Sequence, residues 1–132
     1  MSLVLDTDVV SYLFKGDTRA DALRTHLVGR LLVVSFMTVA ELDRWALARN
    51  WGEARRSRLQ EHLGNFIVHP FDRRLCLEWA EVTDSAERNG NRIGCADAWI
   101  AATARMHSVP LVTNNVAHYR GIERLAVLGP SS

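Results

Sequence analysis

Lysine, cysteine and proline are scarce in this chain. Of its 132 residues only two are Cys, and neither Cys76 nor Cys95 belongs to a CxxC pair, which argues against a cysteine-based zinc site. Lys15 is the only lysine among 16 basic residues, so the others are arginines. Arginine can bind phosphate in a bidentate way that lysine cannot, but codon bias explains the same excess, and both explanations stay open.

Long apolar runs and a strong net charge are also lacking. No stretch approaches the ~20 apolar residues of a membrane span, and the segment Met1–Asp6 lacks the basic start and apolar core of a signal peptide. We therefore expect a cytoplasmic protein with two free thiols and no membrane contact. The net charge of +1 neither favours nor excludes a nucleic-acid partner, because the distribution of charge matters more than its sum.

Short apolar runs alternate with helical periods along the whole chain. Strands are expected at Leu3–Asp6, Leu31–Ser35, Phe66–Val68, Pro110–Thr113 and Leu125–Leu128. Helices are expected at Thr7–Lys15, Thr18–Gly29, Thr38–Arg49, Trp51–Leu63, Phe71–Asn89 and Ala96–His107. Nearly continuous apolar strands are typical of a parallel sheet covered on both faces. The pattern predicts an α/β fold, a three-layer α/β/α sandwich with about five mostly parallel strands. Residues 1–128 would form one domain, and 129–132 a flexible tail.

Polar residues fall where the predicted strands end. Asp6 closes the first strand, and Asp8 stands two residues later. Glu41 lies one turn into the helix after the second strand. Asp97 begins the alanine-rich helix, and Asn115 follows the fourth strand. Sites in open parallel sheets form outside the carboxyl ends of the strands, so we expect these side chains to converge there.

Each of these acids also has a purely structural explanation. Asp6 or Asp8 could cap the following helix, Asp97 could complement a helix dipole, and Glu41 could be solvated. Acids in apolar surroundings are costly unless they are paired or bound to metal, however, and a converging set would repel itself. A divalent cation removes that cost. Oxygen-only ligands favour Mg²⁺ or Mn²⁺, one ion or two, which would activate water for attack on a phosphodiester.

Arginine and tryptophan alternate within residues 44–60. Arg44, Arg49, Trp51 and Arg55 stand out there as candidate contacts. Basic and aromatic side chains together suit an RNA backbone with unstacked bases. The same residues would also suit a groove for a partner protein, or a solvated helix pair whose tryptophans belong to the core, and the three interpretations stay open.

Four segments together resemble the PIN-domain family, and within it the VapC-type toxin ribonucleases of type II toxin–antitoxin systems. They are Leu5–Asp8, Ser35–Leu42, Gly94–Ala102 and Leu111–Asn115, in this order over nearly the whole chain. The resemblance implies that Asp6, Glu41 and Asp97 hold Mg²⁺ or Mn²⁺. Asn115 matches the fourth metal-site position, which is Asp in many relatives. Asp8 matches a variable polar position, and its carboxylate could add the negative charge that Asn115 lacks.

Further residues take roles from the same resemblance. Thr7, Thr38 and Thr113 are expected to line the site. His118 replaces an acid often found at its position, and we expect it to be a surface imidazole, with a phosphate contact or an outer Mn²⁺ ligand as the alternative. The implied activity is that of a metal-dependent endoribonuclease that cleaves structured RNA, tRNA or rRNA. A cognate VapB-like antitoxin would inhibit it, and the toxin would be a homodimer.

Other functions remain to be weighed. A PIN domain that binds RNA without cleaving it is one alternative, because Asn115 weakens the metal site. A phosphotransferase of the haloacid dehalogenase type would use Asp6 as its nucleophile, but it needs a late lysine, and Lys15 comes far too early. A receiver-like or nucleotide-binding module is disfavoured, since neither GxGxxG nor GxxxxGK[ST] occurs.

Overall fold

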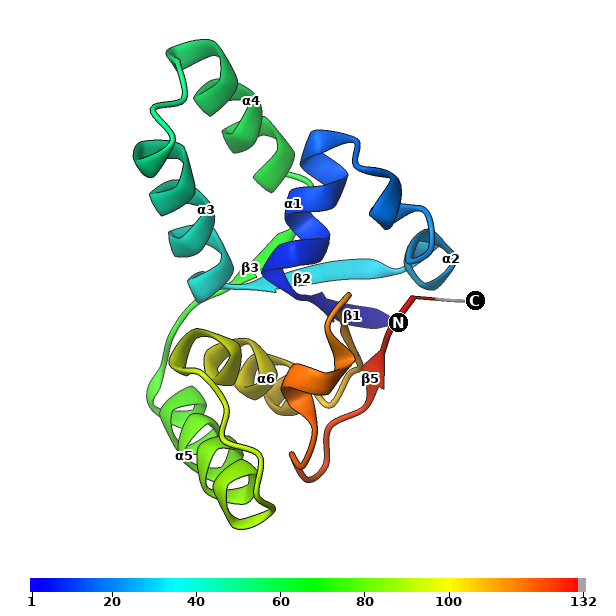
Figure 1. Cartoon of the computed structure of the whole chain (residues 1–132), viewed down its shortest axis with the longest axis vertical. Helices are drawn as coiled ribbons and strands as arrows, with labels where there is room; N and C mark the ends of the chain where they lie inside the picture. Colours follow the sequence, from blue (N-terminus) through cyan, green and yellow to red (C-terminus); the bar gives the residue numbers. More distant parts are fainter. Residues whose placement is uncertain (131–132) are drawn as a thin grey trace.

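The computed structural model describes residues 1–130, and its strands form one parallel sheet with helices on both faces (Figure 1). The strands are β1 (Ser2–Leu5), β2 (Leu31–Ser35), β3 (Ile67–His69), β4 (Leu111–Val112) and β5 (Val127–Leu128). Their order across the sheet is β3-β2-β1-β4-β5, and every neighbouring pair is parallel. The predicted α/β/α sandwich is thereby confirmed, with β1 at the centre of the sheet.

Alternate residues of the central strands point to opposite faces and build two cores. Leu3 and Leu5 pack on the face covered by α1 (Thr7–Lys15), α3 (Phe36–Ala48) and α4 (Glu53–Leu63). Val4 packs on the opposite face, which α5 (Arg73–Arg88) and α6 (Cys95–His107) cover. Figure 1 shows α1, α3 and α4 on one side of the sheet and α5 with α6 on the other. Both faces of β1 are therefore buried, as its unbroken apolar sequence predicts.

The helix predicted at Thr18–Gly29 is wrong. The chain forms a 3-10 turn, η1 (Thr18–Ala20), and then only one short helix, α2 (Arg24–Leu27). Asp17 accepts a hydrogen bond from the Arg19 backbone N–H, which holds the 3-10 turn. Only Ala20 and Leu23 are fully buried in this stretch, so too little apolar surface is covered to stabilise a long helix.

Small residues let α6 lie close to the sheet. Ala98, Ala101, Ala102 and Ala104 are completely buried between the sheet and α5. Alanine favours helix and adds little thickness, so this arrangement follows from the composition of the segment. The N-terminus of α6 then brings Asp97 to the region where the parallel strands end.

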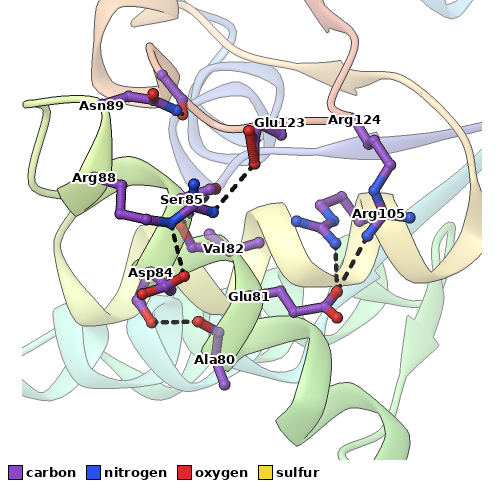
Figure 2. Close-up of polar contacts among 12 residues, drawn as sticks. Ala80, Glu81, Val82, Asp84, Ser85, Arg88, Asn89, Arg105, Glu123 and Arg124 are labelled. Atoms are coloured by element: carbon purple, nitrogen blue, oxygen red, sulfur yellow. Dashed lines mark hydrogen bonds and ion pairs between the residues drawn. The ribbon is translucent and has the colours of Figure 1, made fainter.

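A buried arginine connects α5 to α6. The Arg105 side chain is 3% exposed, and its Nε lies 3.0 Å from Glu78 Oε2. Its Nη2 donates to Glu81 Oε2 at 2.7 Å, and the same oxygen accepts from Arg124 at 3.1 Å (Figure 2). This network ties both helices to the segment between β4 and β5.

The ends and surface of the chain add three facts. Part of the tail predicted at 129–132 lies outside the described residues, but Gly129 is seen, with its carbonyl oxygen 2.8 Å from His26 Nε2. Cys76 and Cys95 are both free. Within residues 1–130 there is no helix of the length and apolarity that a membrane crossing requires.

Candidate active site

Asp6 lies at the end of β1 and is held by hydrogen bonds on both carboxylate oxygens. Its Oδ1 accepts from the Thr7 backbone N–H at 2.7 Å, so Asp6 is the N-cap of α1. Its Oδ2 accepts from Thr113 Oγ1 at 2.7 Å and from Tyr119 Oη at 2.8 Å. The helix-cap explanation of Asp6 is thus correct but incomplete, because Oδ2 is held by hydroxyls from the β4 end of the sheet.

Glu41 is oriented by two threonines. Thr7 Oγ1 donates to Glu41 Oε1 at 2.7 Å, and it lies 2.9 Å from Thr38 Oγ1. Because the single Thr7 hydroxyl proton is given to Glu41, Thr38 must be the donor of the second bond. The three side chains form a relay that links α3 to the first turn of α1. Thr7 and Thr38 are buried, and Glu41 is half-buried.

Asp8 and Asn115 contact each other. Asp8 Oδ2 accepts from Asn115 Nδ2 at 3.0 Å and from the Asn114 backbone N–H at 3.2 Å. Asp8 Oδ1 is buried and has no hydrogen-bond partner among residues 1–130. The Asn115 backbone N–H in turn donates to Thr113 Oγ1 at 3.0 Å. These hydrogen bonds link Asp8, in the first turn of α1, to Asn115, which follows β4.

Asp97 lies in the first turn of α6, beside His118. The Nδ1 atom of His118 is 3.5 Å from Asp97 Oδ2, and the His118 side chain is 60% exposed. His118 is a surface imidazole, as expected, yet it borders the acid cluster. It belongs to η2 (Val116–Tyr119), the 3-10 turn that follows β4.

The four carboxylates influence one another electrostatically. Burial, and then the negative charge of Asp8, raises the pKa of Asp6 to about 7, although the hydrogen bonds from Thr113 and Tyr119 oppose the shift. Burial raises the pKa of Asp8 and of Glu41, and the charge of Asp97 adds to both shifts. Negative charge is therefore concentrated here at a cost in free energy.

This donor set suits a hard divalent cation. It consists of carboxylate oxygens from three separate elements, with one buried and unpartnered oxygen on Asp8. Within residues 1–130, however, no three His, Cys, Asp or Glu side chains are grouped closely enough to hold one ion. The residues thus fit a cation in chemistry and burial, and some side chains must move to ligate it.

Tyr119 is the site residue that sequence analysis missed. It is 3% exposed, and its hydroxyl is a direct partner of Asp6. Burial and the charge of Asp6 raise the pKa of Tyr119 well above its usual range, so it stays a protonated donor. A buried tyrosine hydroxyl normally finds a partner, which is the only signal the sequence offered.

The arginines and tryptophan singled out between residues 44 and 60 lie on α3, on α4 and between them. Arg44 borders Glu41 along one side of α3, where both line a shallow hollow. Trp51 is half-buried: the Phe14 ring stacks with it at 5.7 Å between centroids, and the Arg55 guanidinium lies 4.0 Å from its centroid. Both neighbours already pack against the indole, so Trp51 acts as a support for Arg55.

Fold and site define a PIN domain: residues 3–122 match the PIN domain family, and the chain belongs to it. The chain is 31% identical to Ribonuclease VapC1 of Haemophilus influenzae strain R2866 over 130 residues, 95% of each protein. Among solved structures, it is similar to VapBC-1 from nontypeable Haemophilus influenzae, with a TM-score of 0.82 and 27% identity over 98% of both chains. VapBC2 from Rickettsia felis, solved with a promoter DNA fragment, gives a TM-score of 0.84 at 24% identity over 99% and 100% of the chains, which shows the shared fold. The predicted family is confirmed.

Proposed function

We propose that this protein is a metal-dependent endoribonuclease that cleaves structured RNA. The observation that carries the proposal is Asp6, a buried carboxylate at the end of the central strand, held on Oδ2 by Thr113 and Tyr119 and facing the charges of Asp8 and Asp97. The relative named Ribonuclease VapC1 supports this activity over other uses of an acid cluster.

In this proposal Asp6, Glu41 and Asp97 hold Mg²⁺ or Mn²⁺, and Asp8 and Asn115 lie around them. A bound cation of this kind supplies a nucleophilic water and stabilises charge on a phosphodiester. The hydroxyls of Thr113 and Tyr119 fix the orientation of Asp6, and the Thr38–Thr7 relay fixes that of Glu41. These contacts reduce the reorganisation that ligation requires.

The chief alternative is a PIN domain that binds RNA without cleaving it. Asn115 carries no charge, but its amide donates to Asp8 and keeps that second carboxylate beside the site. Asp8 thus supplies negative charge next to the position where many relatives have an acid. We therefore favour cleavage over binding alone.

Substrate comparison tests the proposal. The purified protein is incubated in Mn²⁺ with one substrate at a time. The three substrates are a structured RNA, a DNA of the same sequence and p-nitrophenyl phosphate. We expect internal cleavage of the RNA only, its loss in Asp6→Asn, and its retention in Asp43→Asn, which removes an exposed acid on α3. Hydrolysis of p-nitrophenyl phosphate with a phosphorylated Asp6 would instead support the phosphotransferase, and RNA binding with no cleavage would support the non-cleaving alternative.

A protein inhibitor belongs to the same proposal. The solved relatives include VapBC complexes, and we propose that a VapB-like antitoxin binds this chain, which would act as a homodimer in the cytoplasm. Co-expression with a short antitoxin-like reading frame, sought directly upstream of its gene, is expected to yield a stable complex without ribonuclease activity. Full activity of a co-purified complex would contradict this part of the proposal.

A further inference from the structure

A basic hollow lies between α1 and α4, separate from the carboxylates. It has a volume of about 680 Å³ and is lined by Phe14, Lys15, Arg55, Arg58, Glu61, His62 and Asn65. Phe14 is the one apolar residue in that lining, and Glu61 the one acid. Burial lowers the pKa of His62 and so disfavours its charged form, although the contact of Nε2 with the Val10 carbonyl oxygen at 3.2 Å opposes this shift. Three cations therefore face one carboxylate.

The cations around the hollow have no acidic partners. Within residues 1–130, no ion pair joins Lys15, Arg49, Arg55 or Arg58 to an acid, whereas Arg19 nearby is paired with Asp17. Partial burial, and then the positive charges of Arg49, Arg55 and Arg19, lowers the pKa of Lys15. The charge of Asp17 opposes this shift but does not cancel it. The only lysine of the chain thus lies in a field of net positive charge, which favours an anionic ligand.

Arg55 is held in place before any ligand arrives. Its guanidinium packs on Trp51, and Trp51 stacks with Phe14 from the far end of α1. The stack removes part of the side-chain entropy that binding would otherwise cost. Cation–π packing leaves the N–H groups at the edge of the guanidinium free to donate to phosphate oxygens.

Helix α1 contributes residues both to the hollow and to the carboxylate site. Lys15 lies eight residues beyond Thr7 on α1, and a helix rises 1.5 Å per residue, so the two are roughly 12 Å apart along α1. If the nucleic-acid axis runs along α1, with the axial rise of about 3.4 Å per nucleotide of a DNA strand, that span corresponds to roughly three or four nucleotides.

We propose that this hollow binds the phosphate backbone of the RNA, a few nucleotides from the bond that is cleaved. The choice of RNA rests on the function proposed above. The lining favours it over an acidic protein segment, because a protein helix would need apolar anchors and Phe14 is the only apolar residue there. The guanidinium groups of Arg55 and Arg58 suit phosphate oxygens in bidentate geometry.

The proposal is tested by measuring the affinity of the protein for a labelled hairpin RNA. Fluorescence anisotropy is recorded over a range of salt concentrations, in EDTA so that a metal-dependent nuclease cannot cleave the RNA. The test variants are Arg58→Ala, whose side chain is exposed, and Arg55→Met, which keeps an aliphatic stem over Trp51. The control is Arg88→Ala/Arg92→Ala, which removes two exposed arginines on and beyond α5, across the sheet. Thermal unfolding of each variant verifies folding.

We expect the Arg55→Met/Arg58→Ala double variant to bind RNA about tenfold more weakly at low salt. The slope of log K against log salt should fall by about 0.7–0.9 for each lost phosphate contact. The control should change neither quantity. If Arg55→Met unfolds, the Arg58→Ala variant alone tests the proposal. We then expect a smaller loss of RNA affinity, and a salt slope that is lower by the amount for one phosphate contact.

Two results would overturn the proposal. One is equal affinity and equal salt slope in the wild type, the test variants and the control. The other is unchanged RNA affinity with lost binding of a polyglutamate peptide, which would assign the hollow to an acidic protein partner. Failure of the proposed function looks different: the wild type binds RNA through the hollow but leaves it intact in Mn²⁺.

Discussion

Single residues at this site have more than one role, and Asp6 shows it best. One of its oxygens caps α1, and the other accepts the Thr113 and Tyr119 hydroxyls. Asp6 can therefore cap α1 and belong to the active site at the same time. The sequence alone could not distinguish these two roles. The position of Asp6 was predictable from the apolar strand before it. Its partner Tyr119 was not, because it comes from a 3-10 turn 113 residues away that no local pattern announces.

Tyr119→Phe tests the role of the phenol. The hydrogen bond from Tyr119 lowers the pKa of Asp6, so its loss should raise that pKa further and move the acidic limb of the rate–pH profile upward. We expect cleavage near neutral pH to fall about tenfold while the fold is retained. Tyr12→Phe, on α1 beneath Arg19, is the matched control. An unshifted pH profile in Tyr119→Phe would contradict this role.

Asn115→Asp tests the missing fourth acid. The new carboxylate would lie beside Asp8 and add one negative charge to the cluster. Calorimetry with Mn²⁺ should show tighter binding than in the wild type, by about tenfold for one added charge at this range. Asn50→Asp, just beyond the C-terminal end of α3, adds the same charge elsewhere and should leave the affinity unchanged. Equal affinities in all three proteins would place Asn115 outside the metal environment.

Among the helices and strands, those that bury much apolar surface were predicted from the sequence more accurately than those that bury little. The helix Thr7–Lys15 and the strand Leu31–Ser35 have the predicted bounds, because a buried apolar pattern defines them and Gly16, with φ 66°, ends the helix. The segment Thr18–Gly29 has helix-compatible residues but little to bury, and it folds as turns. Pairing of α5 with α6 through Arg105 depends on tertiary contacts that a local pattern does not contain.

Arg105→Ala should destabilise the protein much more than Arg124→Ala. Loss of the Arg105 side chain leaves the partly exposed Glu78, whose Oε2 atom is buried, without its counter-charge, which costs about 3 kcal/mol in unfolding free energy. Arg124 is 71% exposed, and its pair with Glu81 contributes about 1 kcal/mol or less (Figure 2). Urea unfolding of both variants measures the difference. Similar midpoints would show that the buried pair does not hold α5 to α6.

For the whole molecule, strand order decides where the acids meet. Asp6 follows the central strand β1, Glu41 comes from α3 beyond β2, and the β4 end contributes Thr113 and Asn115. The parallel order β3-β2-β1-β4-β5 brings these separate segments to one edge. The sheet edge at which these segments end could be predicted from the sequence, because the strand ends were recognisable. The side-chain distances could not, since they depend on hydroxyl partners such as Thr7 and Tyr119.

Metal-free protein should lose stability as the pH rises. The pKa of Asp6 is about 7 in the fold and near 3.8 in the unfolded chain, so the native state binds more protons between these values. In EDTA, we expect the wild type to lose on the order of 3 kcal/mol relative to Asp6→Asn from about pH 4 to about pH 7. The comparison with Asp6→Asn is needed because burial lowers the pKa of His62 and His107, and their ionisation works in the opposite direction. Parallel pH curves for the two proteins would contradict this account.

The central claim is that the carboxylates around Asp6 hold a divalent cation used to cleave RNA. The most direct measurement is the single-turnover rate of RNA cleavage as a function of Mn²⁺ concentration, in wild type, Asp97→Asn and the exposed-acid control Asp43→Asn. We predict a saturable dependence, complete loss in EDTA that added Mn²⁺ reverses, a rate at least about a hundredfold lower in Asp97→Asn, and an unchanged curve for Asp43→Asn. Undiminished cleavage by the wild type in excess EDTA, or by Asp97→Asn in Mn²⁺, would contradict the claim.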